Sequence, residues 1–531
     1  MKNYFLLALF FIIPFKLQAQ TADQYYNLGW DEYNKKNYQA AIENYSKALN
    51  LNPSYSEVYL DRGLAYYYLQ NYGKSIEDYT KAINLNPNYS LAYYDRGISN
   101  YEIKEYSKAV DDLTKAINLK PDYTDAFVER GLAYYYLQNY SKSIEDYSKA
   151  ISLNPNDALA FYDRGITYDE IKEYSKAIED FDKAINLNSV YTDAYIYRGL
   201  VYNNLENYSK AIDDYTKAIN IDPNYALAYY DRAFTYKAQK NYSMAVEDFS
   251  KAININPSYT DAYYNRGLVY NLTGDYSNAK DDFTKAINLN PFYTDAFVYR
   301  GVAYYYLKDY DKSIEDYNKA LNLDHNYALV YYDRGFSYKA QKNYTKSIED
   351  FSEAINIDPG YTNAYYNRGI VYDDQKNYDK ALTDFVKVIE LDSSYTNAYS
   401  YSGTVYIKKN NYPEAIVYYE KTLKLDPNYS SAYDNLGYCY FATKDVDNSI
   451  KNFKKCLELD DKDADADIGL AIVYFSRKDY TNSKTYYLRA KELQPLYGEK
   501  MEGLKKLEED TGYFYTDNEK KILKKIFEKF K

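Results

Sequence analysis

The sequence predicts an all-α protein built as a solenoid of antiparallel helix pairs. A pattern of 34 residues recurs without insertion or deletion from Ala22 to Tyr497, which leaves room for fourteen copies. Both halves of each copy carry apolar residues three or four positions apart, as one face of a helix requires. A single helix pair cannot bury both of its faces, so the copies must stack on one another.

Each copy is numbered here from position 1 to position 34, with Ser90 as position 1 of the third copy. Positions 4, 8 and 11 line one helix, and positions 17, 20, 24 and 27 line the other. Position 20 is Ala or Ser in all fourteen copies, so two helix backbones can approach closely there. Proline at position 32 in ten copies ends the second helix, because it cannot continue a helix.

This period, with small residues at positions 8, 20 and 27, resembles the tetratricopeptide repeat, a helix-turn-helix unit, over about nine tenths of the chain. The resemblance implies a right-handed superhelical solenoid of 28 repeat helices within residues 20–497. The predicted copies are 22–55, 56–89, 90–123, 124–157, 158–191, 192–225, 226–259, 260–293, 294–327, 328–361, 362–395, 396–429, 430–463 and 464–497.

The chain begins with one lysine, an apolar run from Tyr4 to Phe15 and a polar stretch that ends in Ala19. This pattern is typical of a signal peptide at residues 1–19, with an uncleaved membrane anchor as the alternative. The run is short for a bilayer span. We therefore expect an exported protein without a stable membrane anchor after cleavage, in a bacterial periplasm or cell envelope or secreted.

The composition argues against an enzyme. His325 is the single histidine, at position 32 in a connecting loop, and only two cysteines are present, so neither a catalytic triad nor a typical zinc site can be assembled. Twelve of the nineteen glycines occupy position 8, which leaves no glycine-rich phosphate loop. We expect no catalytic residue, no metal and no cofactor. The formal net charge of −12 argues against nucleic acid as a partner.

The two cysteines, Cys439 and Cys456, occupy positions 10 and 27 of the thirteenth copy. Facing core positions of the two helices should sum to about 31, so these residues are offset by about 9 Å along the helices. That exceeds the usual Cα separation of a disulfide. Buried free thiols are therefore expected, with a disulfide as the alternative in an exported protein.

Residues 498–531 are expected to form capping helices. Gly498 to Asp510 is predicted as one helix, and Thr516 to Phe530 as a second that opens with a Thr-x-x-Glu capping box. Its apolar stripe consists of Ile522, Leu523, Ile526, Phe527 and Phe530. The stripe should cover the open face of the last copy; docking to a membrane surface or a partner is the alternative.

In the tetratricopeptide family the first helix of each unit lines a concave groove, which implies that positions 2, 5, 6, 9, 12 and 13 face it. Here tyrosine, aliphatic and acidic residues hold these positions, among them Asp61, Asp95, Asp163 and Asp231 at position 6. Rigid tyrosines are favoured binding anchors. The candidate partner-binding residues are Tyr67, Tyr68, Tyr94, Tyr101, Tyr135, Tyr136, Tyr162, Tyr230, Tyr264, Tyr305, Tyr306 and Tyr332.

These residues favour a scaffold that binds extended peptide or protein segments. Two alternatives stay open: stacking of carbohydrate on the tyrosines, and tyrosines that only pack between neighbouring first helices. The basic clamp of the family, which needs lysine and asparagine at positions 5 and 9, is not carried over, because apolar residues such as Leu64 stand at position 9 here.

Position 7 carries arginine in ten successive copies, and the same ten copies carry aspartate at position 23. Copies one and thirteen instead combine Leu28 with Asn44 and Leu436 with Asn452. The positions sum to 30, so each arginine should meet the aspartate of its own second helix, with the acid of the neighbouring unit as the alternative. The expected pairs are Arg62–Asp78, Arg96–Asp112, Arg130–Asp146, Arg164–Asp180, Arg198–Asp214, Arg232–Asp248, Arg266–Asp282, Arg300–Asp316, Arg334–Asp350 and Arg368–Asp384.

Overall fold

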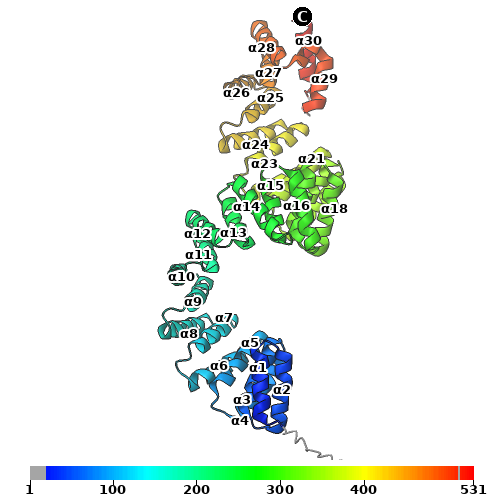
Figure 1. The fold of residues 1–531 in the computed structure, drawn as a ribbon. Helices are drawn as coiled ribbons and strands as arrows, with labels where there is room; N and C mark the ends of the chain where they lie inside the picture. The colour runs from blue at the N-terminus through cyan, green and yellow to red at the C-terminus, as the bar shows by residue number, and fades with distance from the viewer. Residues whose placement is uncertain (1–19, 512–514, 531) are drawn as a thin grey trace, which may run out of the picture. The chain divides into compact units, whose positions relative to one another are not determined.

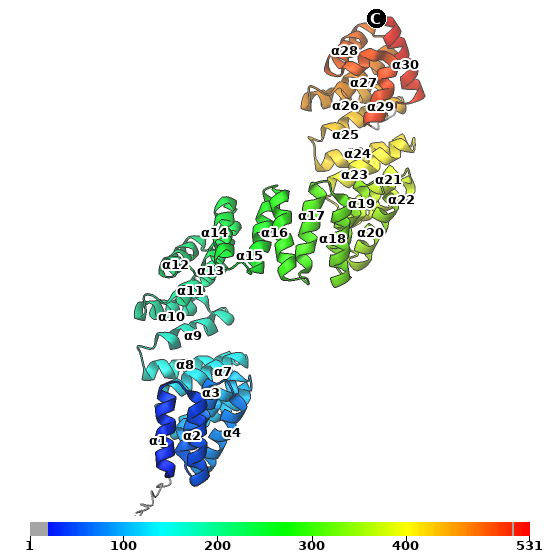
Figure 2. The ribbon, with the colours of Figure 1, turned by 45° about the vertical axis from the view of Figure 1, so that its right-hand side comes forward.

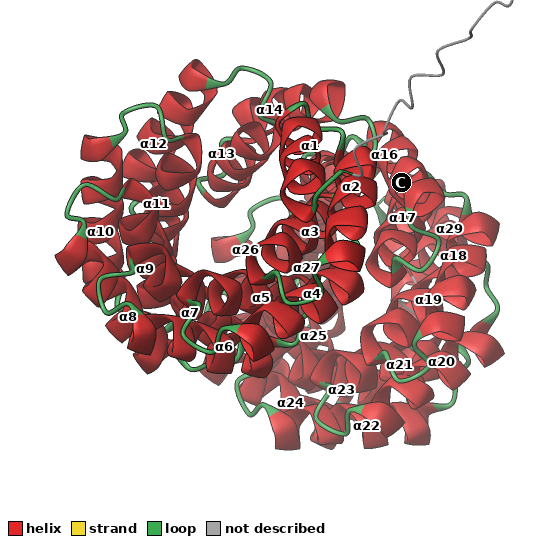
Figure 3. Ribbon diagram, turned by 60° about the horizontal axis from the view of Figure 1, so that its bottom comes forward, coloured by secondary structure: helices red, strands yellow, loops and turns green. Residues whose placement is uncertain are grey.

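The computed structural model describes residues 20–511 and 515–530, so the predicted signal peptide at 1–19 lies outside the described residues. These ranges contain helices and loops and no strand (Figure 3). In the repeats, first helices of 13 residues alternate with second helices of 14 residues, as the 34-residue period predicts. The array is all-α.

Contacts divide the chain into two compact units, Met1–Ala262 and Tyr263–Lys531. The helices of the first unit, stacked pair upon pair in Figure 1, are α1 (Ala22–Asn34), α2 (Tyr38–Leu51), α3 (Ser56–Tyr68), α4 (Tyr72–Leu85), α5 (Ser90–Glu102), α6 (Tyr106–Leu119), α7 (Thr124–Tyr136), α8 (Tyr140–Leu153), α9 (Ala158–Glu170), α10 (Tyr174–Leu187), α11 (Thr192–Asn204), α12 (Tyr208–Ile221), α13 (Ala226–Ala238) and α14 (Tyr242–Ile255).

Helix α15 (Thr260–Leu272) begins in the first unit and continues into the second. The second unit then holds α16 (Tyr276–Leu289), α17 (Thr294–Tyr306), α18 (Tyr310–Leu323), α19 (Ala328–Ala340), α20 (Tyr344–Ile357), α21 (Thr362–Asp374), α22 (Tyr378–Leu391), α23 (Thr396–Lys408), α24 (Tyr412–Leu425), α25 (Ser430–Ala442), α26 (Val446–Leu459), α27 (Ala464–Ser476), α28 (Tyr480–Leu493), a 3-10 helix (Pro495–Glu499), α29 (Lys500–Thr511) and α30 (Asp517–Lys529).

Position 8 of the first helix lies directly against the ring at position 24 of the second helix. At Gly199, an added Cβ would lie 2.7 Å from Cε1 of Tyr215, closer than van der Waals contact allows. The alanines at positions 20 and 27, such as Ala211 and Ala218, are fully buried. The small residues that define the period therefore let the position-24 ring reach the core.

The ring at position 24 also gives a test of the core. The hydroxyl of Tyr45 is buried and has no hydrogen-bond partner among the described residues, whereas at the same position the hydroxyl of Tyr419 lies 2.9 Å from the Thr404 hydroxyl. Tyr45→Phe should stabilise the protein by about 1 kcal/mol, and Tyr419→Phe should destabilise it by about as much. Urea unfolding of both variants measures the difference; equal effects of the same sign would contradict this account of the core.

Helices α29 and α30 follow the last copy, and the first of them differs from its predicted bounds. The helix expected from Gly498 begins at Lys500 instead, because residues 495–499 continue as the 3-10 helix. Thr516 and Glu519 form the capping box of α30. Leu523, Ile526 and Phe527 are buried against the last pair, and Figure 2 shows α30 beside α27. The apolar stripe thus covers the end of the second unit.

Candidate functional site: the first-helix face and its ion-pair ladder

Each of the ten position-7 arginines forms a two-bond ion pair with the aspartate of its own second helix. Nε donates to Oδ2 and Nη2 to Oδ1, at 2.6–2.9 Å in all ten. The aspartate side chains are 3–9% exposed and the arginine side chains 12–20%. The pairs are therefore largely desolvated.

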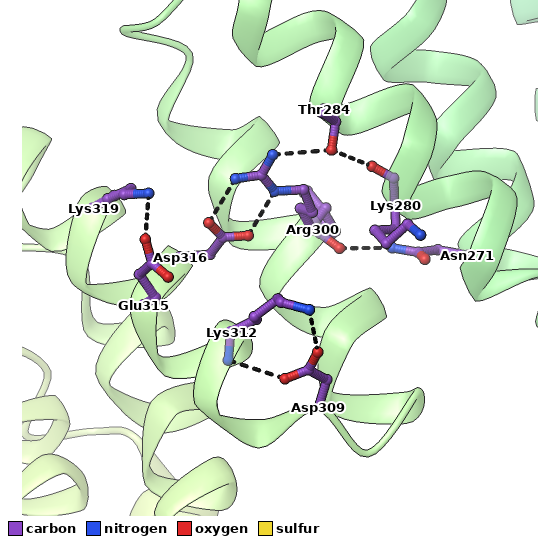
Figure 4. Close-up of polar contacts among 10 residues, drawn as sticks. Asn271, Lys280, Thr284, Arg300, Asp309, Lys312, Glu315, Asp316 and Lys319 are labelled. Atoms are coloured by element: carbon purple, nitrogen blue, oxygen red, sulfur yellow. Dashed lines mark hydrogen bonds and ion pairs between the residues drawn. The ribbon is translucent and has the colours of Figure 1, made fainter.

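The third arm of the guanidinium reaches the preceding copy, which the sequence reasoning missed. Nη1 of Arg300 donates to the Thr284 hydroxyl at 3.0 Å, and Thr284 in turn donates to the Lys280 carbonyl (Figure 4). The same contact to position 25 is made with Ser46, Thr80, Thr114, Ser148, Asp182, Thr216, Asn318 and Ser352. Each of these arginines thus joins its own copy to the preceding one.

Burial and pairing oppose each other in these pairs. Burial outweighs the arginine contacts at Asp146, Asp180 and Asp316, so the pKa of these carboxyl groups lies above its ordinary value. Burial lowers the pKa of the Arg198 guanidinium, but hydrogen bonds to Asp214 and Asp182 outweigh burial, so that this pKa lies above its ordinary value. The arginine also lies over the ring at position 4, with Cζ 5.6 Å from the ring centroid of Tyr195. The charge of Arg198 is therefore paired within the protein. We call the series of ten Arg–Asp pairs the ion-pair ladder, and its role is structural.

The five candidate tyrosines at position 5, in contrast, are packed against rings of their own copies. Their rings contact the tyrosine at position 34 of the same copy, at centroid distances of 4.7–4.9 Å. Four of them also lie against the position-24 phenylalanine. For Tyr94, Tyr162, Tyr230, Tyr264 and Tyr332, packing within the copy is therefore the main role that the geometry supports.

The tyrosine pairs at positions 12 and 13 are different, because one ring of each pair is half exposed. Tyr68, Tyr136 and Tyr306 are 51%, 50% and 55% exposed. Each is stacked on the position-17 tyrosine of the preceding copy, with interplanar angles of 6–13°. Each also meets its position-12 neighbour edge-on, at 83–88°. Tyr101 contacts Tyr106 and Tyr136 at interplanar angles of 58° and 68°.

Four aspartates at position 6 of the first helices carry no basic partner among the described residues. Burial raises the pKa of Asp95, Asp163, Asp231 and Asp333 to about 7 in each case. At the same position, Asp61 differs because its carboxylate accepts a hydrogen bond of 2.9 Å from the Tyr26 hydroxyl. We call the positions 5, 6, 9, 12 and 13 of the first helices the first-helix face.

The two cysteines and the single histidine of the chain do not belong to this face. Cys439 and Cys456 are buried free thiols, and His325 lies exposed in the turn after α18. Residues 20–511 and 515–530 contain no cluster of three or more His, Cys, Asp or Glu side chains placed to hold a metal ion. In the same ranges, no helix is long and apolar enough to cross a membrane.

Comparison with known proteins agrees with the geometry. A model described as "TPR repeat" matches residues 31–70, 131–172, 235–274, 301–342 and 337–376. Models described as "Tetratricopeptide repeat" match 56–89, 158–191, 192–225, 214–247, 260–293, 362–395, 396–429 and 430–463. No curated protein matches the chain.

Solved structures of similar proteins include MamA, at 31% identity over 30% of this chain and 95% of that one, with a TM-score of 0.30. The Cut9-Hcn1 hetero-tetramer of APC/C matches at 17% identity over 90% and 94%, with a TM-score of 0.37. YrrB, titled "a TPR protein with an unusual peptide-binding site", matches at 24% identity over 35% and 95%, with a TM-score of 0.31. With repeat models matching most of residues 31–463 and helix pairs of the same length throughout, the chain belongs to the tetratricopeptide repeat family.

Proposed function

We propose that this protein is a non-catalytic scaffold that binds extended peptide or protein segments along its first-helix face. Tetratricopeptide repeats generally mediate protein–protein interactions, which supports a binding role. The observation that carries the proposal is the set of half-exposed tyrosines, Tyr68, Tyr136 and Tyr306, each held in place by a stacked ring. Anchors that are already rigid lose little conformational entropy on binding.

A partner would gain affinity from many copies at once rather than from one deep pocket. Each tyrosine pair offers a modest contact, and a segment that spans several copies converts later contacts into intramolecular ones. The expected partner is therefore extended, with apolar or positively charged side chains. Binding of sugars to the same rings stays a hypothesis that rests only on the tyrosine content of the sequence.

The test uses peptides selected on the intact protein from a random display library. Replacing Tyr67, Tyr68, Tyr135 and Tyr136 by alanine should weaken their binding by about 2 kcal/mol, roughly a thirty-fold loss, as aromatic hot spots commonly do. Far-UV circular dichroism should show unchanged helicity. A control that replaces the exposed second-helix residues Leu85, Leu119, Leu187 and Leu289 should bind normally. Unchanged affinity of the tyrosine variant would show that this face is not the binding surface.

We also propose that the scaffold works outside the cytoplasm, because the first nineteen residues have the pattern of a signal peptide. Cell fractionation with mass spectrometry of the N-terminus checks this proposal. The expected result is a chain that begins near Gln20, and a full-length chain in the cytosol would contradict it.

A further inference from the structure

Three places on the first-helix face share one set of residues. In each, a tyrosine pair at positions 12 and 13 and a tyrosine at position 24 belong to one copy, and an aspartate at position 6 belongs to the next. The three sets are Tyr67, Tyr68, Tyr79 and Asp95; Tyr135, Tyr136, Tyr147 and Asp163; and Tyr305, Tyr306, Tyr317 and Asp333. The first two lie in the first unit and the third in the second unit.

The third set lines a half-open cavity. Its volume is about 220 Å³, and it is lined by Val302, Tyr305, Tyr306, Tyr317, Asp333 and Phe336. Aromatic rings, one valine and one carboxylate thus line a space with the size of a side chain. A larger hollow of about 550 Å³ beside Arg368 is less suited to a charged ligand, because Arg368 is already paired with Asp384 and Ser352.

The carboxylate of the cavity has no partner of opposite charge. No hydrogen bond or ion pair to the side chain of Asp95, Asp163 or Asp333 is found within residues 20–511 and 515–530. The titratable groups that sense the charge of Asp333 are tyrosines of neighbouring helices and turns, namely Tyr299, Tyr317, Tyr332 and Tyr361. A carboxylate placed among rings in this way costs free energy unless a cation accompanies it.

The rings of the three sets are arranged alike. The two rings of each pair stand 5.5–5.8 Å apart and nearly perpendicular. The half-exposed member is fixed from behind by the stacked tyrosine of the preceding copy, Tyr38, Tyr106 or Tyr276. Electron-rich ring faces next to a carboxylate attract an ammonium or guanidinium group, most strongly where water is excluded.

From this geometry, and resting on the proposed function, we infer that the three sets are pockets for the cationic side chains of lysine or arginine in a bound segment. The ammonium or guanidinium group lies against the tyrosine rings and pairs with the position-6 aspartate. The same position without a tyrosine pair does not make such a pocket. Asp61, for example, already accepts a hydrogen bond from Tyr26, and Asn34 stands where the other sets have a half-exposed tyrosine.

The test measures fluorescence anisotropy of three labelled peptides of equal length on the intact protein. Serine alternates with lysine in the first, with arginine in the second and with Nε-acetyl-lysine in the third. The variant carries Asp95→Asn, Asp163→Asn and Asp333→Asn. Its control carries Glu77→Gln, Glu145→Gln and Glu315→Gln, which removes the same charge from exposed positions on the second helices of the same tyrosine-bearing copies.

The expected result is that the lysine or arginine peptide binds the protein, loses about ten-fold or more in affinity on the aspartate variant, and changes by less than about two-fold on the control. The acetylated peptide should bind at least about ten-fold more weakly, because acetylation removes the charge. Three results would show that the sets are not pockets for cationic side chains. These are equal losses of affinity on both variants, undiminished binding of the acetylated peptide, and no binding of either cationic peptide.

The library-selected peptides distinguish failure of the pockets from failure of the scaffold. If peptides without lysine or arginine bind and still depend on Tyr67, Tyr68, Tyr135 and Tyr136, the first-helix face is a binding surface and only the cationic pockets are wrong. If neither the tyrosine nor the aspartate variant affects any peptide, both proposals fail. Circular dichroism of the aspartate variant should show normal helicity. Each substitution removes a buried charge that costs free energy, so it should not destabilise the fold.

Discussion

Replacing Arg198 by leucine alone should cost about 3–5 kcal/mol of unfolding free energy, among the largest effects of any single substitution in this chain. The change leaves the Asp214 carboxylate, 4% exposed, without its two hydrogen bonds from the guanidinium. It also removes the arm that joins the copy to Asp182 of the preceding one. Urea unfolding followed by circular dichroism measures the loss, and hydrogen exchange should locate it in α11 and α12.

The double variant Arg198→Leu with Asp214→Asn should recover most of that loss and lie within about 1 kcal/mol of the wild type. The chain itself contains this combination. In the thirteenth copy Leu436 is 2% exposed, and the side-chain amide of Asn452 donates to the Asn448 carbonyl at 2.8 Å. Strictly additive losses in the two single variants and the double variant would show that the two side chains do not act as a pair.

Replacing Asp231 by asparagine should stabilise the protein at about pH 8, by roughly 2 to 4 kcal/mol. Asp231 is 9% exposed, one of its carboxyl oxygens has no hydrogen-bond partner among the described residues, and burial raises its pKa to about 7. The groups that face it are Tyr197, Tyr215, Tyr225, Tyr230 and Tyr259, none of which supplies a cation.

The direction in which the stability of the protein changes with pH follows from the raised pKa of Asp231. The folded protein holds the proton of Asp231 up to about pH 7, whereas the unfolded chain releases it near the ordinary value of 3.8. Stability should therefore fall as the pH rises between these two values and become level above about pH 7. The gain from Asp231→Asn should accordingly shrink from about pH 8 to about pH 6, and Asp213→Asn, at an exposed position of α12, should have little effect at either. A gain that grows toward acid pH would contradict the buried charge.

The repeat fold could be predicted because its signal is redundant. Fourteen copies without an insertion place the same small and large residues at the same positions, so an error in one copy is corrected by the others. The Arg–Asp pairs could be predicted for a related reason: positions 7 and 23 change together within one chain, as at Leu436 and Asn452.

The third contact of each arginine was missed because position 25 varies in residue type. Ser, Thr, Asp and Asn all serve there, since any short polar side chain can accept the guanidinium hydrogen. A signal was nevertheless present. Short polar residues fill position 25 in copies one to ten, and Val386 stands there in copy eleven, before the first later copy that lacks the arginine.

The candidate site was predicted only in part, because sequence position does not say which neighbour a ring packs against. Tyr94 and Tyr68 both occupy positions that the family resemblance assigns to the groove. The contact of Tyr94 with Tyr123 depends on the turn at the end of its own copy, and the stacking of Tyr68 on Tyr38 depends on the preceding copy. Only the folded arrangement separates the packed rings from the half-exposed ones.

Photo-cross-linking tests the binding face most directly. A benzophenone side chain is placed either at position 136, on the exposed edge of α7, or at position 145, on the exposed side of α8, and each protein is irradiated with a library-selected peptide. If the first-helix face binds the peptide, cross-links should form from position 136 and none from position 145. Cross-links from position 145 without any from position 136 would contradict it.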